Sequence, residues 1–245
     1  MNAKHDKKRQ YKKENDHSYS FGAYATIELI KSRPEMVREI YVHSNYNGSQ
    51  IVFELCHTND IPISYNDKLI ERMSQKDNIY ILGVFSKYTC TLSPIHPNII
   101  LINPGDSGNL GTIIRTMIGL NILDLGIITP AVDIFNSKTV RSSMGALFCI
   151  RFQQFSSFEA YISKYPGHSF FPFMTENAKL LSLENFPKTP LFSLIFGNEA
   201  SGLSDVYNTI GTPIKIPQSN LTDSFNLSVA AGIGMYVFAN KNELI

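Results

Sequence analysis

The chain has 245 residues, of which 43% are hydrophobic, and a formal net charge of +1 at pH 7. This length is enough for one large domain, or for a small domain followed by a medium-sized one. A net charge so close to zero does not by itself indicate a nucleic-acid-binding protein. No apolar run reaches the length needed to cross a bilayer, which argues against a membrane protein.

Cysteine and histidine usage gives no sign of a metal site. The three cysteines, Cys56, Cys90 and Cys149, show no CxxC pairing, a pattern typical of reduced thiols in the cytosol. The six histidines show no metal-ligand spacing such as HExxH. The N-terminus also lacks the apolar segment of a signal peptide, so we expect a cytoplasmic protein without a bound metal.

The first seventeen residues are predicted to form a basic, disordered tail. Six of them carry positive charge, namely Lys4, Lys7, Lys8, Arg9, Lys12 and Lys13. Two interpretations stay open at this point. The tail either improves solubility alone or acts as a tethered arm that gains affinity from nucleic-acid phosphates.

Residues 18–93 are predicted to form a small α/β domain. Its expected elements are, in chain order, a helix around Tyr24–Lys31, a strand near Glu39–Val42, a helix and a short strand within 49–66, a helix over 68–75 and a strand over 78–88. The segment 91–98 carries two prolines, at positions 94 and 97. It is the best linker candidate, and the domain boundary is placed near Ser93.

From residue 94 to the end of the chain, strands, loops and helices are predicted to alternate in a second domain. The expected elements are a strand over 98–103, a helix over 109–120, a strand over 123–129, a basic helix or turn over 137–148, a strand over 191–196, a short strand over 212–218 and a helix over 224–240. Continuously apolar strands that alternate with helices predict a parallel sheet covered on both faces. Ligands in such sheets bind beyond the carboxyl ends of the strands.

The first unusual segment, NPGDSGNLG at residues 103–111, is a glycine-rich loop that leads into a helix. Free backbone N–H groups in such a loop can bind an anion or a phosphate, although the loop lacks the lysine of a Walker A motif. On the helix that follows, Asn109 and Arg115 lie on a polar stripe opposite a broad apolar face. An arginine in an arbitrary helix is usually solvated, so the loop in front of it is what suggests a function for Arg115.

Two further polar segments follow predicted strands. Gly197 comes directly after the apolar strand 191–196, where a glycine lets a ligand approach the backbone. Glu199 could then pair with an arginine or accept hydrogen bonds from a ligand, the alternative being an acid that caps a helix. Near the start of the last helix, an N-cap role explains Asp223 or Ser224 but leaves Asn226 unexplained.

Together the three segments resemble the motifs of the SpoU/TrmH family of S-adenosylmethionine-dependent RNA 2′-O-ribose methyltransferases, within the SPOUT superfamily. The matching residues are Asn109 and Arg115 in the first motif, Gly197, Glu199, Gly202 and Leu203 in the second, and Ile216, Pro217, Ser224 and Asn226 in the third. The segment Lys138–Leu147 also resembles the Arg-Ser-x-Gly-Ala-Leu segment of the family, and the likeness covers about Asn98–Asn240. The chain departs from the family at Phe225, usually Leu, and at Ala200, usually Gly, so the shape of the cofactor pocket is expected to differ.

The resemblance implies a fold that periodicity could not show. It implies an α/β parallel-sheet SPOUT domain with a deep trefoil knot over residues 94–245, and an obligate homodimer formed through this C-terminal domain. Residues 18–93 more loosely resemble the ribosomal-protein-L30-like (L30e-like) domain with which many members recognise RNA.

The resemblance also implies an activity: methyl transfer from S-adenosylmethionine to a ribose 2′-hydroxyl of structured RNA, with ribosomal RNA ahead of transfer RNA and no metal ion. The implied catalytic residues are Arg115, Asn109, Glu199, Ser224 and Asn226. The residues implied to bind the cofactor are Phe196, Gly197, Ile216, Pro217 and Phe225. The residues implied to bind RNA are Arg115, Lys138 and Arg141. In-line methyl transfer needs an aligned hydroxyl and a place for its proton. Two alternatives remain: a non-catalytic RNA-binding or assembly factor that retains the fold, and an enzyme that binds a nucleotide or phosphate ester through the Gly105–Gly111 loop.

Overall fold

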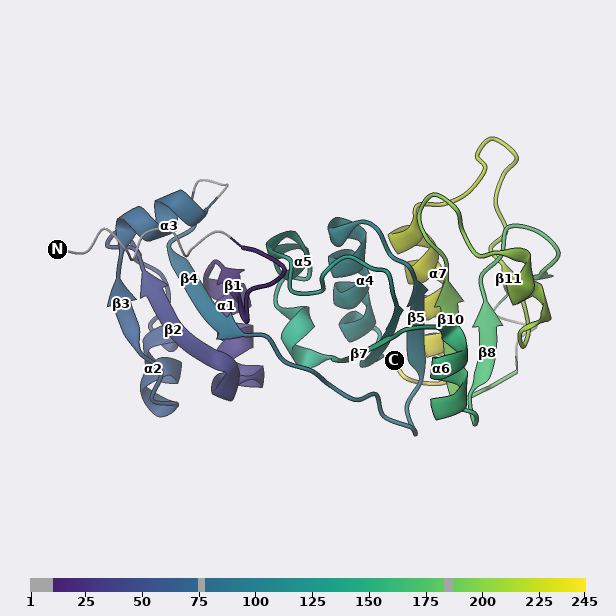
Figure 1. The fold of residues 1–245 in the computed structure, drawn as a ribbon, viewed down its shortest axis with the longest axis horizontal. Helices are drawn as coiled ribbons and strands as arrows, with labels where there is room; N and C mark the ends of the chain where they lie inside the picture. The colour runs from purple at the N-terminus through teal and green to yellow at the C-terminus, as the bar shows by residue number, and fades with distance from the viewer. Residues whose placement is uncertain (1–10, 75–77, 183–186) are drawn as a thin grey trace. The chain divides into compact units, whose positions relative to one another are not determined.

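The computed structural model describes residues 11–74, 78–182 and 187–245, which form two compact units (Figure 1). The first contains the residues up to Tyr88 together with Asp133–Cys149, and the second contains Thr89–Val132 and Ile150–Ile245. The segment Asp133–Cys149 therefore packs with the first unit, although sequence patterns assign it to the second domain; the domain bounds themselves stay a prediction. None of the helices in the described ranges has the length and apolar content of a membrane span.

The first unit is built on a four-stranded sheet. Its elements are β1 (His17–Phe21), α1 (Ala23–Ser32), the 3₁₀ turn η1 (Pro34–Met36), β2 (Val37–Val42), α2 (Ile51–Thr58), β3 (Ile63–Tyr65), α3 (Asp67–Met73) and β4 (Ile81–Ser86). The strand order is β1-β4-β2-β3, and only the β2–β3 pair is parallel. Every predicted helix and strand of this region is confirmed. The strand β1 was not predicted, and it begins at His17, the last residue of the predicted tail. Residues 1–10 of that tail lie outside the described residues.

The segment Asp133–Cys149 completes the first unit with α5 (Ser137–Ser142) and the 3₁₀ turn η2 (Ala146–Cys149). The rings of Phe135 and Phe148 lie 5.9 Å and 5.1 Å from that of Phe85, in edge-to-face geometry. Gly145 has a φ of +84°, and a Cβ there would lie 2.8 Å from the Cβ of Glu28. Aromatic packing and this close approach fix the segment against α1 and β4.

The second unit is built on a five-stranded parallel sheet of order β7-β6-β5-β10-β8. Its elements are β5 (Asn98–Ile102), α4 (Ser107–Gly119), β6 (Asp124–Ile128), β7 (Arg151–Phe155), α6 (Phe158–Lys164), β8 (Ser169–Pro172), β9 (Lys179–Leu180), β10 (Phe192–Phe196), the 3₁₀ turn η3 (Asp205–Thr209), β11 (Ile214–Lys215) and α7 (Leu227–Lys241). The short strands β9 and β11 form a separate parallel pair. The predicted parallel α/β sheet is confirmed.

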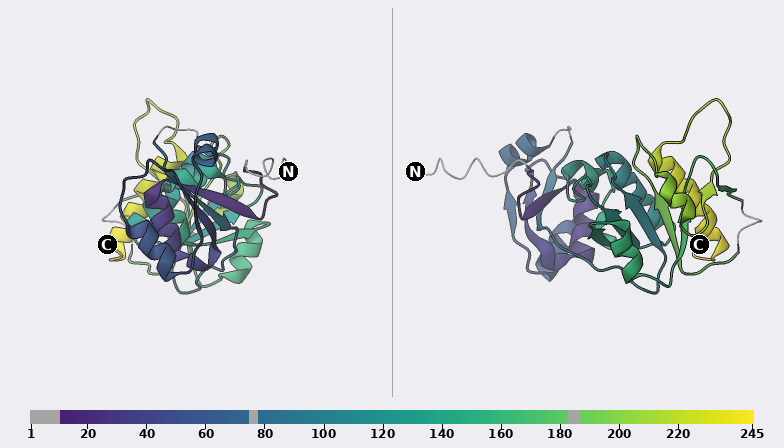
Figure 2. Two further views of the ribbon diagram at one scale, coloured as in Figure 1. Left: turned by 90° about the vertical axis from the view of Figure 1, so that its left-hand side faces the viewer. Right: turned by 45° about the vertical axis from the view of Figure 1, so that its right-hand side comes forward.

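Helices cover both faces of this sheet, α4 and α7 side by side on one face and α6 on the other (Figures 1 and 2). The apolar face predicted for α4 is buried through Leu110, Ile113, Ile114 and Met117. On the other face, Phe158 and Tyr161 of α6 pack in one buried cluster with Ile100 of β5. Because both faces are covered, β5, β6 and β10 consist only of buried residues.

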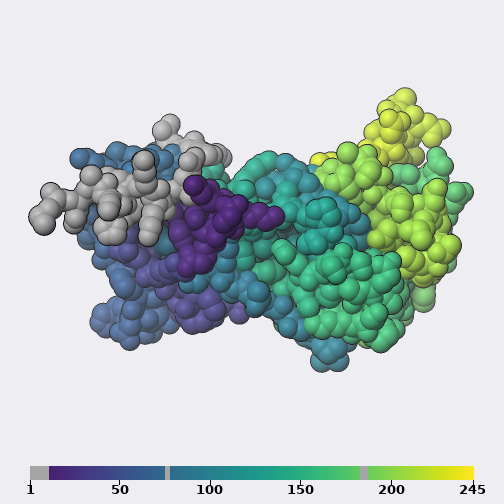
Figure 3. Space-filling view, in the orientation of Figure 1, coloured from purple at the N-terminus to yellow at the C-terminus, as the bar shows by residue number. Residues whose placement is uncertain are grey.

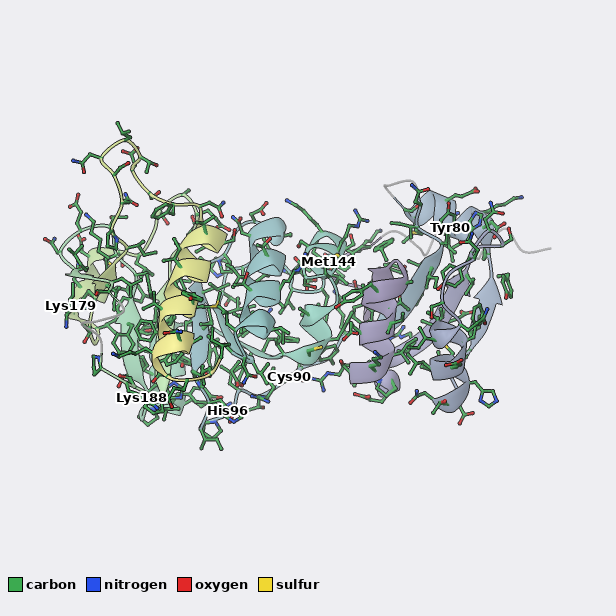
Figure 4. All side chains as sticks on the ribbon, turned by 180° about the vertical axis from the view of Figure 1, so that it is seen from behind. Tyr80, Cys90, His96, Met144, Lys179 and Lys188 are labelled. Carbon is green, nitrogen blue, oxygen red and sulfur yellow. The ribbon has the colours of Figure 1, made fainter. Side chains whose placement is uncertain are left out.

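The amino-terminal edge of the sheet is closed by a buried ion pair. The carboxylate of Asp124 is fully buried, and Arg151 Nε donates a hydrogen bond of 2.7 Å to it. The N–H of Ser93 donates to the same carboxylate at 2.8 Å, and His96 contacts the Arg151 guanidinium at 2.8 Å. Figure 4 shows His96 and Lys188 at this edge. The carboxyl-terminal edge, where ligands bind in such sheets, carries the motif residues.

Candidate active site

Three loops meet at the carboxyl ends of the central strands. Residues 103–106 follow β5, residues 197–204 follow β10, and residues 216–226 lead from β11 into α7 (Figure 1). Strands β5 and β10 are neighbours, and α4 leads from β5 to β6 on the other side. This reversal of strand order is a topological switch point, the usual ligand site of an open parallel sheet. The three motif segments predicted from the sequence therefore lie at one place.

The carboxylate of Glu199 binds the glycine-rich loop. It accepts hydrogen bonds from the N–H of Gly105 at 2.9 Å, from the N–H of Asp106 at 3.0 Å and from Asn109 Nδ2 at 3.3 Å. The N–H groups that predicted an anion site are thus engaged by an anion of the chain itself. This contact does not favour the alternative in which the loop binds a phosphate ester.

These contacts also set the charge of Glu199. Partial burial on its own would raise the pKa of the carboxyl, but the N–H groups of Gly105 and Asp106 and the Asn109 amide outweigh it, so the pKa is lowered. Glu199 is therefore ionised at neutral pH. Because its oxygens already accept several hydrogen bonds, it is suited to holding other groups in place rather than to taking up a proton.

Asn109 links this carboxylate to the third motif. Its Oδ1 accepts a hydrogen bond of 3.2 Å from Asn226 Nδ2. Asn226 is itself the N-cap of α7, and its Oδ1 accepts from the N–H of Ser228 at 2.8 Å. The cap is therefore Asn226, rather than the Asp223 or Ser224 expected from the sequence. Because each amide is hydrogen-bonded through both its nitrogen and its oxygen, Glu199, Asn109 and Asn226 form one connected polar set.

A cavity of about 360 Å³ opens beside this set. Of the predicted cofactor residues, four line it, namely Phe196, Gly197, Ile216 and Phe225; the predicted catalytic residues Glu199 and Ser224 also line it. Pro217 is exposed and does not. The ring of Phe173, which no motif singles out, stacks on that of Phe196 at 4.4 Å and also lines the cavity. The lining carries two carboxylates, Glu199 and Asp223, and one ammonium, Lys215.

The loop after β10 turns back on itself at Gly197. The N–H of Gly202 donates to the carbonyl of Asn198 at 2.9 Å, and Gly202 has a φ of +65°. A Cβ at position 197 would lie 2.2 Å from the carbonyl carbon of Gly202 and 2.4 Å from the N of Leu203. Residue 197 therefore has to be glycine for the loop's own sake, and not only to leave room for a ligand.

We expect Gly197→Ala to lower the free energy of unfolding by about 1–3 kcal/mol, because backbone atoms rather than a flexible side chain must move. Gly167→Ala is the matched control, since its added Cβ would lie 3.8 Å from Leu191 in ordinary contact. Urea unfolding of both variants checks the expectation. Equal stability of the two variants would contradict the close approach at Gly197.

The structure does not bring every predicted residue to this set. Arg115 lies exposed on α4, outside the cavity lining, and makes no hydrogen bond or ion pair with any residue that the structure describes. Lys138 is exposed on α5 of the first unit. In the same unit the Arg141 guanidinium lies 4.9 Å from the centre of the Phe21 ring. The roles given to these three residues stay predictions.

Two residues that support the site were not singled out from the sequence. Asp106 caps α4 by accepting from the N–H of Asn109 at 2.8 Å. Asn198 Nδ2 donates to the carbonyl of Asn103 at 2.8 Å and so ties the loops after β10 and β5 together. The N-cap pattern of an aspartate before a helix could have indicated Asp106. For Asn198, its position between Gly197 and Glu199 was the only signal.

Comparison with known proteins shows which family the chain resembles. Residues 96–236 match the SpoU rRNA Methylase family. A 23S rRNA (guanosine(2553)-2′-O)-methyltransferase of Bacillus subtilis is 31% identical over 134 residues, 54% of this chain and 53% of that protein. An uncharacterised tRNA/rRNA methyltransferase of Synechocystis is 29% identical over 134 residues, 54% of this chain and 48% of that protein. The chain thus spans about half the length of these two relatives.

Matches that cover more of the chain are also to RNA methyltransferases. A 23S rRNA (uridine(2479)-2′-O)-methyltransferase of Streptomyces viridochromogenes is 27% identical over 215 residues, 85% of this chain and 71% of that protein. The crystal structure of the SpoU methyltransferase AviRb from the same organism, in complex with the cofactor AdoMet, superposes with a TM-score of 0.79 at 19% identity and covers 93% of this chain and 91% of that one. An AdoMet-bound rRNA methyltransferase from Sinorhizobium meliloti has a TM-score of 0.77 at 21% identity, with 92% and 87% covered, so the fold is shared. The chain belongs to the SpoU rRNA methylase family.

Proposed function

We propose that this chain transfers a methyl group from S-adenosylmethionine to a ribose 2′-hydroxyl of RNA. The observation that carries the proposal is the polar set of Glu199, Asn109 and Asn226, which joins all three motifs beside the cavity. Membership of the family supports it, as do two relatives whose names describe 2′-O-methylation of 23S rRNA.

The residues around the cavity fit the cofactor. The volume of about 360 Å³ lies in the range of small-molecule sites. The stacked rings of Phe173 and Phe196 offer an apolar wall, and the carboxylates of Glu199 and Asp223 suit a ligand that carries positive charge. Phe196, Gly197, Ile216 and Phe225 would hold the cofactor, whose methyl group is carried on a positively charged sulfur. Pro217 would fix the direction of the backbone after Ile216.

The chain's own groups would position the nucleotide. Glu199 holds Asn109, and Asn109 holds Asn226, so the amide orientations are set before a substrate arrives. Ser224 is exposed and lines the cavity, so its hydroxyl can contact the ribose. Arg115 would stabilise the negative charge that develops on the 2′-oxygen. Glu199 and Asn109 are thus positioning residues in this mechanism.

For the substrate we propose structured RNA in the cytoplasm, with ribosomal RNA ahead of transfer RNA. The named 23S rRNA relatives support this order, and Arg115, Lys138 and Arg141 are the cations that we assign to RNA. Mapping of 2′-O-methylation across total RNA, with and without the gene, tests the proposal. Loss of one methylated ribose identifies the target. An unchanged map, together with measurable S-adenosylmethionine binding, would favour the non-catalytic RNA-binding factor instead.

We assign RNA recognition to the first unit, with a ribosomal-protein-L30-like fold. Its four-stranded sheet with helices α1 to α3 supports the assignment. For the second unit we propose the deep trefoil knot, on the strength of its membership of the family. The basic residues of the tail that precede Tyr11 lie outside the described residues, and we propose that they add affinity for RNA phosphates.

We also propose a homodimer formed through the second unit. Val229 and Tyr236 of α7 are 48% and 51% exposed, and seven residues apart they lie on the same face of the helix. These two exposed side chains offer apolar surface on α7 for a second copy of the chain.

We expect Tyr236→Asp to weaken dimerisation by at least about 2 kcal/mol, because it places a charge in the apolar centre of the interface. Tyr65→Asp is the control, since Tyr65 is 69% exposed on β3 of the first unit. Sedimentation equilibrium at micromolar concentrations should give a dimer for the native chain and for Tyr65→Asp, and a monomer for Tyr236→Asp. Dimeric Tyr236→Asp would place the interface elsewhere.

A further inference from the structure

The loop of residues 218–224 projects from the second unit between β11 and α7 (Figures 1 and 3). Leu221, near its tip, is 96% exposed. The residues around it are exposed as well, namely Ser219, Asn220, Thr222, Asp223 and Ser224. Because no apolar packing fixes the loop, its conformation depends on its own hydrogen bonds.

Gln218 closes the base of this loop. Its Nε2 donates to the carbonyl of Asp223 at 2.9 Å and to the carbonyl of Thr222 at 3.2 Å. The hydroxyl of Thr222 adds a bond of 3.2 Å to the carbonyl of Ser224. One side-chain amide therefore joins the two ends of the loop, and a second, weaker contact continues toward α7.

The joined end of the loop is also a wall of the cavity. Asp223, Ser224 and Phe225 line the cavity, and so does Gln218 itself. If the amide of Gln218 released the two carbonyls, this wall would be free to move away from the cavity. A ligand would then have to order the loop as it binds, which costs affinity.

We propose that Gln218 is a positioning residue for the cofactor, which preorganises Asp223, Ser224 and Phe225 as one wall of its site. This inference rests on the proposed function, because it assumes that the cavity holds S-adenosylmethionine. Only an amide and backbone carbonyls take part in the closing contacts, so the effect of Gln218 on affinity is expected to be independent of pH between 6 and about 9.

Gln218→Met tests the inference, because methionine has a similar length but no N–H donor. Gln154→Met is the matched control, at an exposed position on β7 outside the cavity lining. For Gln218→Met we expect the calorimetric Kd for S-adenosylhomocysteine to rise about tenfold, and the KM for S-adenosylmethionine to rise by a similar factor. The kcat at saturation should stay within about threefold of native, and the Tm of the free protein should be unchanged. Thr222→Val should shift Kd in the same direction by a smaller factor.

A Kd for Gln218→Met equal to that of the Gln154→Met control would overturn the inference and leave the proposed function intact. A fall in kcat with unchanged Kd and KM would also overturn it, because Gln218 would then act in the transfer step. A lower Tm for Gln218→Met than for the Gln154→Met control, together with a higher Kd, would also overturn the inference. Gln218 would then stabilise the fold as a whole rather than the cofactor site. Failure of the native chain to bind S-adenosylhomocysteine would refute the proposed function, and this inference with it. Tight binding without any methylated RNA would count against catalysis alone.

Discussion

Glu199→Gln should slow methyl transfer by about two orders of magnitude while the chain stays folded. The carboxylate holds the N–H groups of Gly105 and Asp106 and the amide of Asn109. Glutamine keeps the shape but turns an N–H₂ group toward these donors, so part of the set must open. A displacement of about 1 Å in a positioned group is enough to cost about 100-fold in rate.

Single-turnover rates, measured with enzyme in excess over RNA, check this expectation. Glu176→Gln is the control, because Glu176 is exposed in the same unit and does not line the cavity. Native rates in Glu199→Gln would show that the negative charge at position 199 is not needed. In that case the site would depend on the shape of the loops alone.

The same substitution should show a defined pH dependence of stability. The pKa of Glu199 is lower in the folded chain than its ordinary value. Its contribution to the free energy of unfolding is therefore fully present above about pH 4–5 and is lost as the pH falls through the folded pKa. Because Glu199 is exposed and its charge is screened by solvent, urea unfolding should give a difference between native chain and Glu199→Gln of only about 0.5–1 kcal/mol. This difference should be constant from pH 8 to about pH 5 and shrink below about pH 4. A difference that grows toward acid pH would show instead that folding raises the pKa of Glu199.

Sequence patterns predict the central part of the fold because burial there is uniform. Strands β5, β6 and β10 contain only buried residues and read as continuous apolar runs, and α4 shows a clear apolar face. Patterns predict neither β7 nor β8, at the two edges of the sheet. In β7, Arg151 and two glutamines interrupt the apolar pattern, because Arg151 pairs with buried Asp124.

Sequence patterns do not predict β1 either, because two of its buried residues are polar. Ser18 and Ser20 are both fully buried, yet serine reads as a loop residue. Ser18 donates a hydrogen bond of 2.6 Å to the carbonyl of Phe135, and Ser20 pairs with Thr26 at 2.9 Å. The partner of Ser18 lies in the segment Asp133–Cys149, so only the folded chain shows why this serine suits a strand.

For the candidate site, too, the sequence predicts one part and not the other. The identities of Asn109, Glu199 and Asn226 follow from the motifs, but their connections do not. Glu199 and Gly105 are far apart in sequence, and nothing local indicates that the carboxylate of one meets the N–H of the other. A glycine-rich loop predicts an anion without saying which anion. The fold supplies that anion from the loop after the neighbouring strand.

The largest effect on activity is expected for Arg115. Arg115→Ala should reduce methyl transfer by about 10³-fold, the order of loss seen when one group that stabilises developing negative charge is removed. The Kd for S-adenosylhomocysteine should not change, because Arg115 is exposed and lies outside the cavity lining. Calorimetry on the same protein sample separates the two quantities. A parallel loss of cofactor binding would place the guanidinium in the cofactor site instead.

Arg115→Lys then distinguishes two roles for this residue. A guanidinium stays protonated in proteins, so it is poorly suited to be the base that takes the 2′-hydroxyl proton. We therefore expect Arg115 to act through its charge and its planar pair of donors, by holding an RNA phosphate and stabilising the developing alkoxide. Lysine keeps the charge but loses the paired donors, and it deprotonates more readily. The phosphate-binding role predicts little recovery of the single-turnover rate in Arg115→Lys at any pH between 6 and about 10. A rate that rises with pH toward the native value would establish Arg115 as the base.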